Sequence, residues 1–96
     1  MANFTVRVEL HHAEWADYEN LHAAMEQRGF SRRITSDSGT TYQMPWAEYN
    51  GSGVLTCAQV RDIAKAAADT TGKQSAVLVT EAASRAWVGL DALTTV

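Results

Sequence analysis

FTVRVEL, residues 4–10, alternates apolar and polar side chains without a break. Such alternation is typical of a β-strand that buries one face and leaves the other open. We expect the four apolar residues of this strand to face a layer of helices. Arg7 and Glu9 are expected on the open face of a sheet, where they either pair with each other or contact a partner.

The rest of the chain divides into a helix, two strands, a second helix and a last strand. Their expected ranges are 13–28, 31–35, 43–52, 57–70 and 75–80. This βαββαβ order predicts an α+β, ferredoxin-like sandwich, in which a four-stranded antiparallel sheet carries both helices on one face. The length of 96 residues suits a single domain, residues 1–96.

Local patterns fix the ends of the helices and part of the core. Gly29 is a strong stop for the first helix, and Thr56 with Gln59 forms a capping box at the start of the second. Trp15 belongs to an apolar stripe of the first helix, so we expect it in the core. Tyr49 is expected to point into the core from the strand at 43–52.

The last strand is apolar almost throughout, although this fold places it at an edge of the sheet. An exposed apolar edge strand tends to pair with another strand or to be covered by another segment. The segment 82–96 is expected to cover it as a tail or an additional edge strand, or a second copy of the chain is expected to pair with it. The sequence thus predicts a homodimer, with Trp87 and Val88 in the interface.

Composition narrows the classes of function. The net charge of −3 disfavours non-specific binding of duplex nucleic acid. No run approaches the roughly 20 apolar residues that span a bilayer, and no secretory signal is visible, so we expect a cytoplasmic protein without membrane contact. Cys57 is the single cysteine and is expected to be structural.

Five stretches carry a family resemblance: Gly29-Phe30-Ser31, Asp37 with Gly39, Gln43-Met44, Tyr49, and Leu55–Ile63. They resemble the GhoS-type antitoxins of type V toxin–antitoxin systems, in a register that runs from the first strand into the second helix. That family is ferredoxin-like and resembles the CRISPR-associated adaptation nucleases. The resemblance implies an antitoxin that acts on mRNA as an RNA-binding protein or endoribonuclease.

The resemblance also implies positions for functional residues. The related nucleases use an acidic residue near the end of the first strand, for which Glu9 or His11 is the nearest counterpart. The antitoxins suggest a basic residue for RNA contact in the first helix, where His22 or Arg28 stands.

The residues themselves suggest the same chemistry. A ribonuclease that needs no metal uses an acid and a base, and histidine suits both roles because its pKa lies near neutrality. His11 and His22 are therefore candidate catalytic residues. The alternative is that His11 lies in a solvent-exposed loop without a function and that His22 is an ordinary residue on the flank of the first helix. We expect no metal site and no cofactor.

Arginine supplies the expected RNA contacts. Arg28, Arg32 and Arg33 form the main basic cluster, and with Arg7 they are candidates for binding single-stranded RNA through its phosphates. The alternative role for this cluster is a charged edge that prevents aggregation.

A second function, from another class, fits the negative net charge of the chain. This is a non-enzymatic protein-binding or inhibitor module of a phage or mobile element. A cleft lined by Arg32, Arg33 and His11 would indicate RNA. An exposed patch around Trp46 or Trp87 without a basic groove would indicate a protein partner.

Overall fold

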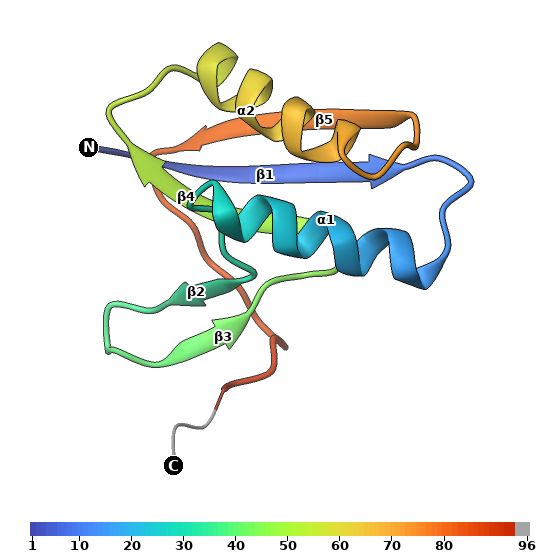
Figure 1. Cartoon of the computed structure of the whole chain (residues 1–96). Coiled ribbons are helices and arrows are strands. Elements are labelled where there is room, and N and C mark those ends of the chain that lie inside the picture. The colour runs from blue at the N-terminus through green and yellow to red at the C-terminus, as the bar shows by residue number, and fades with distance from the viewer. Residues whose placement is uncertain (94–96) are drawn as a thin grey trace.

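A computed structural model describes residues 1–93 of the chain (Figure 1). It confirms the predicted α+β class. The elements in chain order are β1 (Ala2–Leu10), α1 (Trp15–Gln27), β2 (Arg33–Thr35), β3 (Thr41–Gln43), β4 (Glu48–Gly53), α2 (Cys57–Asp69) and β5 (Ser75–Ala82). Neither helix has the length and apolar character that crossing a membrane requires.

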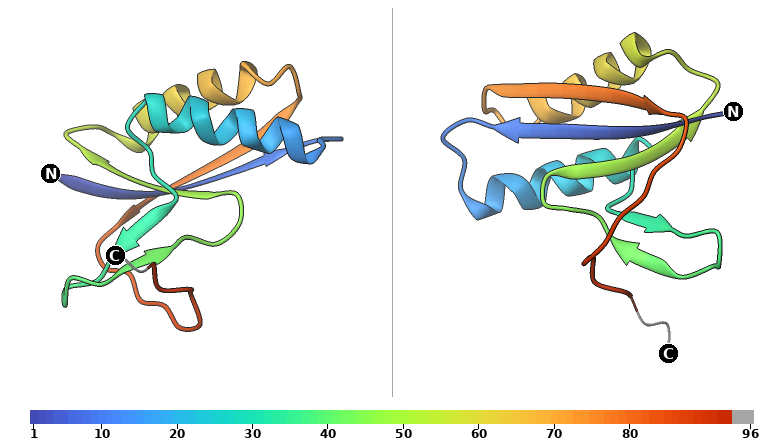
Figure 2. Two further views of the ribbon diagram at one scale, coloured as in Figure 1. Left: turned by 60° about the horizontal axis from the view of Figure 1, so that its bottom comes forward. Right: turned by 180° about the vertical axis from the view of Figure 1, so that it is seen from behind.

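The main sheet is antiparallel, with strand order β4-β1-β5 and β1 in its centre. In its register, Val6 lies opposite Tyr49 on one side and Val79 on the other. Both helices cover one face of this sheet, while the β2–β3 hairpin and the C-terminal tail lie on the other side (Figure 2). The last strand is at a sheet edge, as predicted.

The sheet differs from the predicted four-stranded one. The expected strand at 43–52 is divided into β3 and β4, because a turn around Pro45 separates them; the Glu48 amide donates to the Pro45 carbonyl at 3.1 Å, and Ala47 has φ +65°. The expected strand at 31–35 pairs with β4 at a single bridge in the described chain, between Ser31 and Asn50, and Nδ2 of Asn50 also donates to the Arg33 carbonyl at 3.1 Å. Beyond the bridge the chain leaves the sheet and pairs β2 with β3 instead.

The core confirms most of the sequence pattern. Phe4, Val6 and Val8 are fully buried on the helix side of β1, and Tyr49 is fully buried beside them. The prediction for Trp15 is wrong, because 67% of its surface is exposed. Trp15 is the first residue of α1, and there it stacks on Trp46 instead of packing on the sheet.

The end of α1 is fixed by its last turn. Gly29 has φ +87°, and its amide donates to the Glu26 carbonyl while the Phe30 amide donates to the Met25 carbonyl, both near 3 Å. This reversal directs the Phe30 ring onto the backbone of β4 at Gly51. A Cβ atom at residue 51 would lie 2.5 Å from Cδ1 of Phe30.

The tail after β5 crosses the open face of the sheet rather than covering the edge of β5 (Figure 2). Nη1 of Arg85 donates to Oδ1 of Asn50 at 2.8 Å, which fixes the tail to β4. Further on, Ala92 forms a bridge with Tyr42. The described part of the segment 82–96 is therefore a tail with one bridge to β3; its residues 94–96 lie outside the described part of the chain.

Candidate functional site

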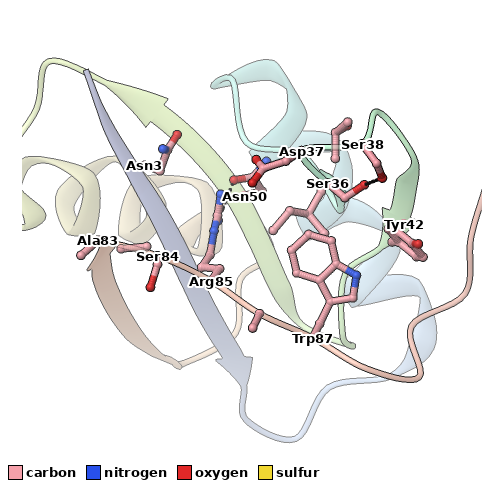
Figure 3. A pocket seen from close by; sticks show the side chains of 14 residues that line it. Asn3, Ser36, Asp37, Ser38, Tyr42, Asn50, Ala83, Ser84, Arg85 and Trp87 are labelled. Carbon is pink, nitrogen blue, oxygen red and sulfur yellow. Dashed lines mark hydrogen bonds between the residues drawn. The ribbon is translucent and has the colours of Figure 1, made fainter.

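A groove of about 790 Å³ lies between the open face of the sheet, the β2–β3 hairpin and the tail (Figure 3). Its lining is mostly polar, and the rings of Tyr42 and Trp87, the side chain of Ile34 and three alanines of the segment 82–96 supply the apolar part. These two rings meet edge to face, with centroids 5.5 Å apart. Side chains that line the groove include Asn3, Ser36, Asp37, Asn50 and Arg85.

The tail positions the cationic side of this groove. Besides Asn50, Nη1 of Arg85 lies 3.4 Å from the carbonyl of Phe4 and 3.4 Å from the hydroxyl of Thr5. These contacts hold the guanidinium over β1 and β4, in the centre of the open face. The groove thus combines an aromatic wall, amide and hydroxyl groups, one arginine and one carboxylate, Asp37.

A second pocket, of about 490 Å³, lies beside the first one. It shares Arg85 and Trp87 with the groove, and Met44, Pro45 and Leu90 make it more apolar. The tail therefore divides the space over the open face into a polar part and an apolar part.

His22 forms a separate polar pair on the helix side of the sheet. It is only 4% exposed, and its Nδ1 is hydrogen-bonded to the hydroxyl of Tyr49 at 2.6 Å. Nε2 has no hydrogen-bond partner within residues 1–93. Burial lowers the pKa of His22, as does the charge of Arg32, while Glu19 and Glu26 act in the opposite direction. Burial likewise raises the pKa of Tyr49.

The structure does not bring the three predicted catalytic residues together. Glu9 lies on the open face and forms an ion pair with Arg7 at 3.0 Å. His11 is exposed in the loop after β1, and His22 is buried on the other side of the sheet. Across the described 93 residues, no group of three or more His, Cys, Asp or Glu side chains could hold a metal ion.

The predicted RNA-binding arginines are also spread over the molecule. Arg7 faces two carboxylates, Glu9 and Glu48, on the open face. Arg28 donates from Nη1 to the Ala24 carbonyl, whereas Arg32 and Arg33 belong to the segment that enters the hairpin. None of these four residues, and neither His11 nor His22, lines the groove. The basic cleft that would have indicated RNA is therefore not formed by them.

The predicted interface residues differ in their surroundings. Trp87 is half-buried against Tyr42 and lines the groove, whereas Val88, the next residue, is 94% exposed. Their role in an interface between copies stays a prediction.

Sequence reasoning missed Arg85, Tyr42 and Asn50. For Asn50 a signal existed, because it alternates with the buried residues Tyr49 and Gly51 in β4 and so must face the open side. Arg85 and Tyr42 lie in short irregular segments, where no periodicity shows which way a side chain points.

No protein-family model matches this chain, and no curated protein is significantly similar to it.

Proposed function

We propose that the protein binds single-stranded RNA in the groove beside Trp87, as an antitoxin of the GhoS type that acts on mRNA. One observation carries the proposal: the groove places an aromatic wall, amide groups and the Arg85 guanidinium around one space. Single-stranded RNA is recognised in this way, by bases that stack on aromatic rings and donate or accept hydrogen bonds along their edges.

The charge of the groove sets the mode of binding. Arg85 is the cationic side chain among the residues that line it, and Asp37 is the anionic one. We therefore infer that stacking contributes more than phosphate contact. A single phosphate contact gives a slope of only about −0.7 in a plot of log affinity against log salt concentration.

The finer fold assignment belongs to the same proposal. A ferredoxin-like ancestry is supported by the position of β1 in the centre of the sheet and of β5 at its edge. The bridge between Ser31 and Asn50 stands where a fourth strand would pair with β4.

We propose Glu9 and His11 as the residues that would take part if the protein cleaves RNA, since both lie near the end of β1 and are exposed. His22 is less suited, because its ring is buried between α1, to which it belongs, and the side chains of Tyr49 and Trp46. Binding of RNA is the primary proposal. Whether the protein also cleaves the RNA is decided by the cleavage experiment below.

Trp87→Ala is expected to weaken the binding of fluorescently labelled single-stranded RNA by about fivefold or more, since stacking of a base on an aromatic ring contributes about 1–3 kcal/mol. Fluorescence anisotropy measures the affinity. Trp46→Ala is the matched control, because Trp46 lies against α1 outside the groove, and it should change the affinity less than about twofold.

The same RNA is then examined for cleavage, with and without a chelator of divalent metals and beside His11→Ala. Intact RNA that binds through Trp87 supports a binding protein. Cleavage that His11→Ala abolishes adds endoribonuclease activity. If RNA of several sequences stays unbound, or if both tryptophan variants weaken binding equally, the groove is not the RNA site.

We also propose a homodimer in which two β5 strands pair across a two-fold axis. Within the described residues, no strand pairs with the outer edge of β5, and Leu78, which lies opposite Arg7 on the open face, is 64% exposed. Leu78→Lys removes two apolar side chains from this interface and should weaken the dimer at least about tenfold, as measured by analytical ultracentrifugation.

Val54→Lys is the control, since Val54 is 90% exposed after β4, away from β5. The dissociation constant of the dimer should be the same for this variant as for the wild type. A wild-type chain that sediments as a monomer at every concentration would contradict the dimer.

A further inference from the structure

Trp15 and Trp46 form an exposed aromatic pair on the helix side of the molecule. Their rings stack with centroids 5.0 Å apart and an angle of 23° between their planes. Tyr18 and His22 support Trp46 from below, at centroid distances of 5.3 and 5.5 Å. With 67% and 48% of their surfaces exposed, the two indoles form a contiguous aromatic patch, and such patches rimmed by polar residues mark interaction sites.

Carboxylates lie on the same face of α1. Glu19 follows Trp15 by one helical turn and Glu26 follows by three, so the helix places both on the side of the indole pair. The charges of both also raise the pKa of His22, whose ring lies against Trp46. Neither carboxylate forms an ion pair with any residue of the described chain, and the charge of Arg32 also acts on His22, in the opposite direction to theirs.

We name these four residues, Trp15, Trp46, Glu19 and Glu26, the aromatic–acidic surface. We propose that it binds an arginine-bearing segment of a partner protein. A guanidinium group stacks flat on an indole ring, and its remaining N–H groups donate to carboxylates. Tryptophan is also the residue type most typical of the energetic centres of protein interfaces.

The charge of the surface separates this site from the groove. Glu19 and Glu26, which have no ion-pair partner among residues 1–93, repel the phosphates of RNA and attract a cationic peptide. The proposal therefore adds a protein partner to the RNA-binding function and does not depend on it. A protein-binding role is the alternative function predicted from the sequence. The proposal assigns that role to a defined surface with a defined chemistry.

Labelled oligoarginine and oligolysine peptides of equal length test the proposal by fluorescence anisotropy. We expect the arginine peptide to bind more tightly than the lysine peptide, because only arginine stacks as a planar group. Trp15→Ala should weaken binding of the arginine peptide by about two- to fivefold, as expected for one exposed cation–π contact. Trp15 is mostly exposed, so this variant should keep the thermal midpoint of the wild type.

Two double variants separate a specific site from bulk charge. Glu19→Gln with Glu26→Gln should weaken the arginine peptide by about fivefold. Asp62→Asn with Glu81→Gln removes the same charge from α2 and β5 and should change the affinity less than about twofold. Trp87→Ala should leave peptide binding unchanged.

The proposal is refuted if the two double variants weaken binding of the arginine peptide equally. It is also refuted if the wild type binds both peptides with equal affinity and Trp15→Ala does not change that affinity. If Trp15→Ala instead dissociates a dimer or releases bound RNA, the occupant is a second copy or a nucleic acid, and the proposal fails.

Discussion

Replacing Gly51 by alanine is expected to lower the free energy of unfolding by about 1–3 kcal/mol, although it adds only one methyl group. The new Cβ would lie 2.5 Å from Cδ1 and 2.6 Å from Cε1 of Phe30. The Phe30 ring is buried and follows the tight end of α1 at Gly29, so it has little freedom to move. Urea unfolding monitored by circular dichroism measures the change.

Gly53→Ala is the matched control in the same strand. Its Cβ would meet Leu55 at 3.4 Å, near ordinary contact distance, so the free energy of unfolding should stay within about 0.5 kcal/mol of the wild type or rise. Phe30→Leu should make the Gly51→Ala substitution less costly, with a coupling of at least about 0.5 kcal/mol. Equal stability of the two alanine variants would contradict the close approach of Phe30 to β4.

Acid is expected to destabilise the protein through His22. The pKa of this residue is lowered in the folded state, chiefly by burial and further by Arg32, while Glu19 and Glu26 oppose the shift. In the unfolded chain the pKa returns to about 6.5. As pH falls from 6.5 to the folded pKa, the unfolded chain binds more protons than the folded one, so stability decreases. Above pH 6.5 this contribution is fully present.

The difference in free energy of unfolding between wild type and His22→Gln isolates this effect, because contributions of the carboxylates common to both proteins cancel. The stability of the wild type relative to the variant should fall by about 1.4 kcal/mol for each unit by which the pKa is lowered. His11→Gln is the control for removal of an imidazole, since His11 is exposed in the loop after β1. A constant difference for His22→Gln between pH 7.5 and 4.5 would show that His22 is not buried as a neutral group.

Local patterns predicted much of the fold. The alternation in residues 4–10 identified β1 and its buried face, because burial on one side imposes a period of two residues. Gly29 marked the end of α1, and Thr56 with Gln59 marked the start of α2, since both signals depend on hydrogen bonds between near neighbours. Trp15 was misplaced because helical periodicity gives the direction of a side chain and not whether the sheet extends beneath it.

The candidate site was less predictable, because its contacts join distant parts of the chain. Arg85 reaches Asn50 and Phe4, and His22 reaches Tyr49 across two turns and a hairpin. The turn at Pro45 moved β3 out of the main sheet, which created the space between hairpin and sheet. A proline signals such an interruption, but the direction of the chain after it depends on what the neighbouring segments leave free.

The central position of β1 has a consequence for synthesis on the ribosome. β1 emerges before every other element, yet both of its edges are completed late, one by β4 and the other by β5. Until Ser75–Ala82 has left the exit tunnel, one backbone edge of β1 has no permanent partner. Nascent chains that stall between α2 and β5 therefore expose an unpaired strand edge that can pair with other chains. We expect them to depend on chaperones more than the finished protein does.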